Sequence, residues 1–315
     1  MPFFTVIIPL YNKENYVESA LKSVLNQTFT DFEVSLVNDC STDKSIAKIE
    51  SYLSEKVTLI HHEKNKGLSA ARNTGIQNAK AEYITYLDAD DVWKTDFLSA
   101  IKELIDSFNE AKIFATNYEE IYGNKIVIPQ NGTKFLVQNS KQIIDFFKHN
   151  LQQGIYNHGS VCFHKSVFGK VGFYDETINF SEDIDFNIRA NSQFKLAYYN
   201  VVGMQYTMQS ENQITTSKIS DKNLPDYSKY DDLALKNPDL KKYLDFERYV
   251  LAKHLKFEGS SEKSKEIIKQ IALKSLNRKQ QFLLLFPTSV VKALTWIKKF
   301  LVQKGIKITS YSNTK

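Results

Sequence analysis

The 315-residue sequence is poor in cysteine: it has only Cys40 and Cys162, and no Cys-x-x-Cys pair. Two isolated thiols cannot build a disulfide framework, and they supply too few sulfur ligands for a structural zinc site. Such scarcity is typical of proteins that fold in a reducing compartment. We therefore expect a cytoplasmic protein.

Long apolar runs are also missing. Pro287 ends the run from Phe282 to Phe286, and Lys292 interrupts the residues that follow. No stretch reaches the ~18 uninterrupted apolar residues of a membrane-spanning helix. The first residues lack the basic lead, apolar core and cleavage site of a secretory signal. We expect neither a signal peptide nor a membrane span.

Two glycine motifs that cradle phosphate groups are absent as well. No Gly-x-Gly-x-x-Gly follows the first predicted strand, and no Walker Gly-Lys-Ser/Thr occurs. These absences argue against a dinucleotide-binding or P-loop protein.

Charge is distributed unevenly. Residues 1–240 contain 24 Lys+Arg and 31 Asp+Glu, a balance of −7, whereas residues 241–315 contain 17 and 5, a balance of +12; together they give the net charge of +5. A basic tail on an acidic body indicates contact with something anionic, such as phospholipid or nucleic acid. Lysines and aromatic residues in the tail follow helix amphipathicity rather than a recognition motif, which argues against nucleic acid.

Strand-like and helix-like segments alternate through residues 1–95. Apolar and β-branched runs predict strands at 3–10, 32–37, 57–60 and 83–87, with helices at 16–25, 46–52 and 68–79 between them. This alternation predicts parallel βαβ units in a sheet covered by helices on both faces. Farther along we expect helices at 97–108, 141–151, 165–171 and 182–190, and strands at 113–116, 159–163 and 196–202.

The strand predicted at 83–87 runs directly into three carboxylates, Asp88, Asp90 and Asp91. Ligands of open α/β sheets bind at the carboxyl ends of strands, and residues two apart there can point to the same side. Asp88 and Asp90 can therefore share one divalent cation whose remaining positions are filled by water and phosphate. The alternative is a helix start that these acids cap, with Asp91 at the beginning of the helix.

Ordered motifs along residues 3–215 resemble the family 2 glycosyltransferases. The matching segments are Val6–Asn12, Gln27-Thr28, Phe32-Glu33, Asn38–Asp43, Asn65–Gly67 with Ala71–Gly75, Leu87–Asp91 and Glu182–Phe186. Each motif is weak alone, but their shared order and spacing make a chance match implausible.

The resemblance implies an α/β protein of the GT-A fold, with a mixed, mostly parallel sheet flanked by helices. It also divides the chain. A Rossmann-like, nucleotide-sugar-binding half is expected at 1–105, an acceptor-binding half at 106–220, and a C-terminal extension of basic helices at 221–315.

The resemblance further implies a nucleoside pocket formed by Pro9, Tyr11 and Asp39. An aromatic ring can stack on a base, and a carboxylate can accept the N3–H of uracil. The implied donor is therefore a UDP-sugar. In the structural alternative, Tyr11 is a buried aromatic at a strand end and Asp39 is only a turn residue.

The implied diphosphate end contains Arg72 as a nucleotide-side cation and the pair Asp88 and Asp90. These carboxylates are implied to meet the ribose and a Mg²⁺ or Mn²⁺ ion, with Asp90 the preferred direct ligand. Such an ion stabilises the charge that develops on a departing diphosphate. The structural alternative for Arg72 is an ion pair with a surface acid.

On the acceptor side, the resemblance implies that Asp183 is the catalytic base and that Glu182 lies beside it. The acceptor hydroxyl must lose a proton as it attacks, so a carboxylate is needed on the opposite face of the sugar. The expected reaction is inverting transfer of a hexosyl or N-acetylhexosaminyl group to a glycan or lipid-linked acceptor during synthesis of capsule, O-antigen or exopolysaccharide. The structural alternative is that both acids merely favour a helix dipole.

The sequence departs from the family at two places. Asn38-Asp39-Cys40 stands where two acids and a glycine are frequent. The segment Tyr206–Asn212 has no Arg or His, where many relatives carry a basic residue near the diphosphate. We assign no residue there.

Two other functions stay open at this point. Leu87–Val92 also fits the Asp-x-Asp-x-Val start of haloacid-dehalogenase-like phosphatases, with Asp88 as the nucleophile, although that motif normally opens the fold. The basic tail alone would suit a non-catalytic, membrane-associated binding protein.

Residues 239–315 have a helical pattern. An apolar stripe is formed by Val290, Val291, Leu294, Ile297 and Leu301, beside Trp296 and Phe300, and is surrounded by Lys292, Lys298, Lys299, Lys304 and Lys307. A basic amphipathic helix of this kind can lie on anionic lipid at the cytoplasmic face of the plasma membrane. The alternative is a helix packed on the catalytic domain.

Overall fold

The computed structural model describes residues 1–315 apart from 130, 215–216, 292, 294–296 and 298–315. Its centre is a ten-stranded mixed sheet in the order β3-β2-β1-β4-β9-β6-β10-β5, with β7 paired to β6 and β8 to β10. The strands are β1 Phe4–Leu10, β2 Phe32–Asn38, β3 Val57–His61, β4 Tyr83–Tyr86, β5 Val92–Trp93, β6 Ala111–Tyr122, β7 Lys125–Val127, β8 Lys141–Ile144, β9 Val161–His164 and β10 Lys195–Thr207.

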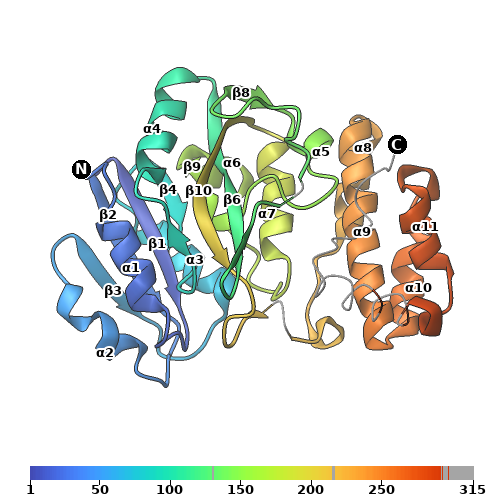
Figure 1. The fold of residues 1–315 in the computed structure, drawn as a ribbon, viewed down its shortest axis with the longest axis horizontal. Coiled ribbons are helices and arrows are strands. Elements are labelled where there is room, and N and C mark those ends of the chain that lie inside the picture. Colours follow the sequence, from blue (N-terminus) through green and yellow to red (C-terminus); the bar gives the residue numbers. More distant parts are fainter. Residues whose placement is uncertain (130, 215–216, 292, 294–296, 298–315) are drawn as a thin grey trace.

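Helices cover both faces of this sheet and continue beyond one end of it (Figure 1). They are α1 Val17–Leu25, α2 Ser45–Ile49, α3 Leu68–Asn78, α4 Phe97–Ser107, α5 Phe146–His149, α6 Ser166–Val171, α7 Glu182–Asn191, α8 Asp231–Leu235, α9 Pro238–Glu258, α10 Ser261–Lys269 and α11 Arg278–Leu285.

The first half is the predicted parallel unit. Strand β1 is buried along its whole length and runs parallel to both β2 and β4, and β3 runs parallel to β2. The carboxyl ends of these strands therefore share one edge, where ligands of open α/β sheets bind. Helix α3 packs very closely on β1, because a Cβ atom added at Gly75 would lie 2.4 Å from Cγ2 of Ile7.

The second half mixes strand directions: β9 is antiparallel to β4 and β6, whereas β10 is parallel to β6. The prediction of a helix at 141–151 is wrong in part. Lys141–Ile144 forms β8, antiparallel to β10, and the helix α5 is confined to Phe146–His149. Asp145 separates the two elements, because its side chain accepts a hydrogen bond from the backbone N–H of Lys148 and caps the helix.

The acid run after β4 does not start a helix. Strand β5 follows Asp91, and helix α4 begins only at Phe97. Oδ1 of Asp91 instead accepts a hydrogen bond from the backbone N–H of Thr207 at 2.8 Å. Asp91 therefore holds the end of β10 next to the residues that follow β4. Burial raises the pKa of the Asp91 carboxyl group.

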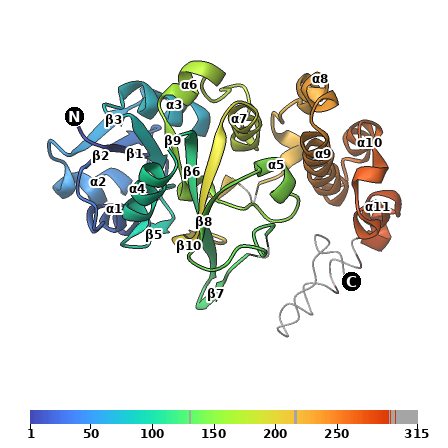
Figure 2. The ribbon, with the colours of Figure 1, turned by 90° about the horizontal axis from the view of Figure 1, so that it is seen from above.

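Helices α9, α10 and α11 lie side by side at one end of the molecule, next to α5 (Figures 1 and 2). Tyr243 of α9 packs its ring against Phe146 and Phe147 of α5, with centroids 5.3 and 5.6 Å apart. The first part of the predicted tail thus packs on the catalytic body. Within the described residues, no helix is both long and apolar enough to cross a bilayer.

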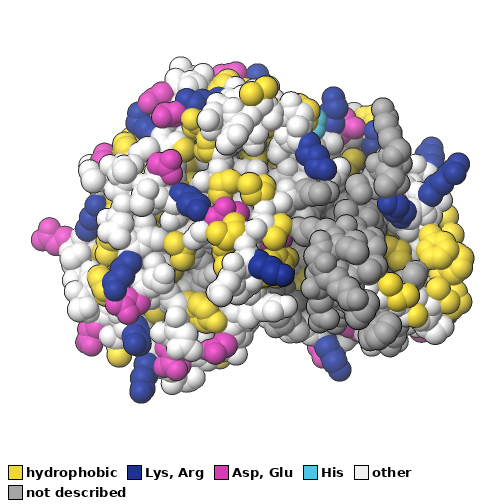
Figure 3. Space-filling view, viewed as in Figure 1, with side chains coloured by type: hydrophobic (Ala, Val, Ile, Leu, Met, Phe, Trp, Pro, Cys, Tyr) yellow, Lys and Arg dark blue, Asp and Glu magenta, His cyan; other side chains and the backbone are white. Residues whose placement is uncertain are grey.

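Only part of the predicted apolar stripe and of the lysines around it can be compared with the structure. Val290, Val291 and Ile297 are described, whereas Lys292, Leu294, Trp296, Lys298, Lys299, Phe300, Leu301, Lys304 and Lys307 lie outside the described residues. Helices α10 and α11, which precede the stripe in the sequence, form one end of the molecule, and hydrophobic side chains gather there (Figure 3). Phe282, Leu285 and Phe286 are the exposed apolar residues at the end of α11.

Candidate active site

A large cavity of about 1070 Å³ opens at the carboxyl edge of β1, β2 and β4. All eight predicted site residues line it: Pro9, Tyr11, Asp39, Arg72, Asp88, Asp90, Glu182 and Asp183. The structure therefore brings together residues from the two ends of a span of more than 170 positions.

Pro9 and Tyr11 come from β1 and the turn that follows it. Tyr11 is 44% exposed, so it is not a buried strand-end aromatic and its ring can receive a planar ligand. The neighbouring turn explains one departure from the family pattern. Cys40 has φ of +67°, in the left-handed region that favours glycine, which fits the resemblance's expectation of a frequent glycine at this position.

Asp39 is buried and organises the loop before α3. Its Oδ1 accepts hydrogen bonds from Nδ1 of His62 and the backbone N–H of Lys66, both at 2.7 Å, and its Oδ2 accepts one from the backbone N–H of Gly67 at 2.8 Å. The turn role considered for Asp39 is thus present. Three of about four acceptor positions are used, which leaves room for one donor from a ligand.

Arg72 is buried and joins two predicted motifs. Its Nη1 donates to Oε1 of Glu182 at 2.7 Å, and its Nη2 donates to Oδ1 of Asp88 at 3.3 Å. Both partners line the cavity, so the ion pair with a surface acid is not what the structure contains. The guanidinium holds the acid run after β4 against the start of α7.

Asp88 and Asp90 both line the cavity. Asp88 is 30% exposed, whereas Asp90 is nearly buried and pairs with Lys13, whose Nζ lies 2.7 Å from its Oδ2. No cluster of three or more His, Cys, Asp or Glu side chains suited to a metal exists among the described residues. The donor set nevertheless fits Mg²⁺ or Mn²⁺, which needs only one or two carboxylates when phosphate oxygens complete its shell.

Glu182 and Asp183 occupy the first turn of α7, after Ser181 in the left-handed region with φ of +62°. Burial, followed by the charge of Glu182, raises the pKa of Asp183 to about 6, and Arg72 opposes this shift. An aspartate of this kind is ionised at neutral pH and has more basicity than an exposed one. The site thus contains a carboxylate suited to accept a proton.

Helix α9 adds a wall that the sequence motifs do not reveal. Glu247, Val250 and His254 line the cavity, and their i, i+3, i+7 spacing places them on one helix face. Burial raises the pKa of Glu247 to about 8 and lowers that of His254 to about 4. Glu247 and His254 could have been identified from the sequence as polar residues that recur at helical spacing on an otherwise apolar helix face.

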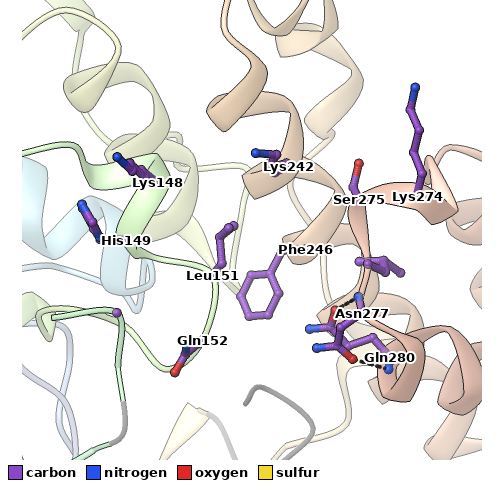
Figure 4. Close-up of a pocket in the computed structure, with 12 residues that line it drawn as sticks. Lys148, His149, Leu151, Gln152, Lys242, Phe246, Lys274, Ser275, Asn277 and Gln280 are labelled. Carbon is purple, nitrogen blue, oxygen red and sulfur yellow. Dashed lines mark hydrogen bonds between the residues drawn. The ribbon is translucent and has the colours of Figure 1, made fainter. Parts of the chain in front are cut away.

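A second cavity of about 510 Å³ lies between α5 and the C-terminal helices. Figure 4 shows the Phe246 ring in the middle of it, Lys148 and His149 on one side, and Asn277 and Gln280 on the other. Lys274 extends away from the centre. The cationic groups do not converge on one point, so this cavity lacks the geometry of a phosphate site.

Comparison with known proteins identifies the family of the chain. Residues 5–172 match the family model "Glycosyl transferase family 2". The uncharacterized glycosyltransferase EpsJ of Bacillus subtilis is 27% identical over 219 residues, which cover 68% of this chain and 63% of that protein. The putative teichuronic acid biosynthesis glycosyltransferase TuaG of the same organism is 37% identical over 99 residues, covering 31% and 39%. The chain thus spans less than two thirds of either relative.

Among solved structures, Staphylococcus aureus TarS residues 1–349 in complex with UDP-GlcNAc superposes with a TM-score of 0.61 at 19% identity, covering 77% of this chain and 70% of that TarS fragment. At this identity the likeness concerns the fold, and it confirms the predicted GT-A architecture. The family model covers more than half of the chain. The chain therefore belongs to glycosyl transferase family 2.

Proposed function

We propose that the protein is an inverting, metal-dependent glycosyltransferase that moves a sugar from a UDP-sugar to a hydroxyl of a glycan or lipid-linked acceptor in cell-surface polysaccharide synthesis. One observation carries the proposal: a single cavity holds an exposed aromatic ring, a carboxylate pair and a separate carboxylate of raised pKa. Binding of UDP-GlcNAc by TarS and the teichuronic acid assignment of TuaG support the donor and the pathway class.

The nucleoside would lie against Tyr11, with its base near the remaining acceptor position of Asp39. Asp88 and Asp90 would hold the divalent ion, whose Lewis acidity supplies the stabilisation of the departing diphosphate. Arg72 keeps Asp88 oriented through its hydrogen bond. These groups bind and orient the donor, and none of them has to act as an acid.

Asp183 would accept the proton of the attacking acceptor hydroxyl. Because the hydroxyl approaches from the face opposite the diphosphate, one displacement inverts the anomeric centre. Arg72 occupies Oε1 of Glu182 and so distinguishes the two neighbouring acids. Glu182 positions the start of α7 on the acceptor side, and Asp183 is left as the base.

The family assignment removes the phosphatase alternative in which Asp88 is a nucleophile. The remaining alternative, membrane association through the basic tail, is compatible with catalysis. We propose that the enzyme works at the cytoplasmic face of the plasma membrane, with the exposed apolar end of α11 and the basic residues after it on anionic lipid.

Transfer from a panel of UDP-sugars, with Mn²⁺ or Mg²⁺ added after chelation, tests the proposal. We expect Asp183→Asn to abolish transfer while UDP binding is retained. Asp106→Asn, which changes an exposed carboxylate of α4, is the matched control and should leave transfer unchanged. Unchanged transfer by Asp183→Asn would contradict the assignment of the base.

A further inference from the structure

A lysine from the N-terminal turn occupies the place where the sequence offers no cation. The segment Tyr206–Asn212 contains no Arg or His, yet Nζ of Lys13 lies against it. That ammonium donates to the backbone carbonyl oxygen of Glu211 at 2.6 Å and to Oγ of Ser210 at 3.4 Å. Its third partner is Oδ2 of Asp90 at 2.7 Å.

The backbone around Lys13 is fixed, so the side chain has a defined origin. Its N–H donates to Oγ of Ser45 at 2.8 Å, and its carbonyl oxygen accepts from the N–H groups of Tyr16 and Val17 at the start of α1. The Lys13 side chain is only 10% exposed and reaches from this anchor into the cavity. Desolvated, prepositioned ammonium groups interact strongly with anions because little solvent screens them.

The charges around the cavity show why this group matters. Asp88, Asp90, Glu182 and Asp183 make the wall acidic, and the buried Arg72 already pairs with two of them. Lys13, Lys66 and Lys222 also line the cavity, and of these three lysines Lys13 is the one that pairs with Asp90. A nucleoside diphosphate adds further negative charge, so its binding requires positive groups that still have donors to offer. Lys13 is placed beside Asp90 with an ammonium that can exchange its carboxylate partner for a phosphate oxygen.

We propose that Lys13 is the diphosphate-binding cation of this enzyme and that it leaves Oδ2 of Asp90 when the divalent ion and the donor arrive together. The inference rests on the proposed function. Before the donor binds, the ammonium neutralises Asp90. Afterwards the divalent ion takes over that carboxylate and Lys13 turns to the diphosphate. Lys13 therefore has opposite effects on the binding of the ion alone and on the binding of the nucleotide.

Calorimetric titration of the full chain with three probes, each in the presence of Mn²⁺, tests this proposal. UDP carries base and diphosphate, uridine only the base, and inorganic pyrophosphate only the diphosphate. For Lys13→Met we expect about tenfold or greater loss of affinity for UDP and pyrophosphate, equivalent to about 1.4 kcal/mol or more. Uridine affinity should not change, and Lys13→Arg should keep most of the UDP affinity.

The binding of Mn²⁺ alone, followed by electron paramagnetic resonance, gives the second readout. We expect Lys13→Met to bind free Mn²⁺ more tightly than the wild type, because the competing ammonium is gone. Lys64→Met removes an exposed lysine outside the cavity and should match the wild type in every titration.

The outcomes separate the two proposals. Equal losses for UDP and uridine, or unchanged binding of UDP and pyrophosphate, would overturn the role of Lys13 while the UDP-sugar donor stands. A wild-type protein that binds pyrophosphate but not UDP would contradict the donor, and the pyrophosphate titration of Lys13→Met would still decide the role of Lys13. Weaker binding of free Mn²⁺ by Lys13→Met would overturn the exchange at Asp90.

Discussion

Arg72 donates a hydrogen bond to Glu182 at 2.7 Å and so joins α3 to α7 across 110 positions of the chain. Both side chains are almost inaccessible to solvent. A buried ion pair of this kind fixes the relative position of the elements that carry it, because either charge alone would be costly to bury. The donor motifs and the predicted base therefore keep a fixed geometry through this pair.

Removal of Arg72 should destabilise the fold as well as the site. We expect Arg72→Met to lower the free energy of unfolding by about 3–5 kcal/mol, because Glu182 and Asp88 lose a buried partner. The double variant Arg72→Met/Glu182→Gln should recover part of the loss. Urea denaturation measures both, and Lys80→Met, at an exposed lysine, is the control. A loss below 1 kcal/mol would show that water replaces the guanidinium.

The rate of transfer should fall at acidic pH with an unusually high midpoint. Asp183 must be ionised to accept a proton, and its raised pKa means that activity is present above about pH 6 and is lost as the pH falls through that value. In Glu182→Gln the neighbouring negative charge is gone, so the midpoint should move to lower pH. The measurement is kcat/KM for the acceptor as a function of pH, with the UDP-sugar at saturation. A midpoint that is the same in both proteins would rule out this coupling.

Glu247 should make stability depend on pH in the opposite sense from a salt-bridged acid. Its pKa rises from 4.5 to about 8 on folding, so the unfolded state ionises first and stability declines as the pH rises through that window. We expect Glu247→Gln to raise the free energy of unfolding by about 1–3 kcal/mol at pH 8 and by about zero near pH 4. Glu262→Gln, at an exposed glutamate of α10, should show no difference at either pH.

Close packing of α3 on β1 gives a steric prediction. In Gly75→Ala the new methyl group meets the buried Ile7 side chain, and we expect a loss of about 1–3 kcal/mol in the free energy of unfolding. Ile7→Ala in the same chain should relieve the clash, so the double variant loses less than the sum. Gly169→Ala is the control in α6, where no atom lies within 4 Å of an added Cβ. Thermal or urea unfolding decides between additive and compensating effects.

The proposed lipid contact predicts salt-sensitive binding to vesicles. The +12 balance of residues 241–315 should make the full chain sediment with vesicles of anionic lipid and not with purely zwitterionic ones. Replacing Lys298, Lys299, Lys304 and Lys307 by Gln should release it. Retention by this variant at low salt would show that these four lysines are not what binds.

The parts of this molecule that could be predicted are those governed by local pattern. Strands β1 and β2 are rich in apolar and β-branched residues, and Asp88 and Asp90 follow a third strand of this kind. The edge of the sheet and the carboxylates at it could therefore be predicted together. The strand β8 was missed because four residues are too few for periodicity to separate a strand from a helix.

Lys13 and Glu247 were missed for a different reason. Their significance comes from contacts across large sequence distances: Lys13 meets Asp90 77 positions away, and Glu247 meets the cavity only because α9 folds back on α5. A lysine after a strand, or a glutamate in a helix, carries no such information by itself. Long-range packing decides these roles.

The position of α9 also bears on the choice between acceptor and water. An activated sugar reacts with whichever hydroxyl reaches it, so an enzyme that builds a polymer must keep bulk solvent from the reacting carbon. Glu247, Val250 and His254 close one side of the cavity, and the helix that carries them belongs to the C-terminal extension. We expect a chain ending near residue 238 to lose this wall of the cavity. The rate of donor hydrolysis should then increase relative to the rate of transfer to the acceptor. The C-terminal helices would then determine how faithfully the sugar is delivered as well as where the enzyme resides.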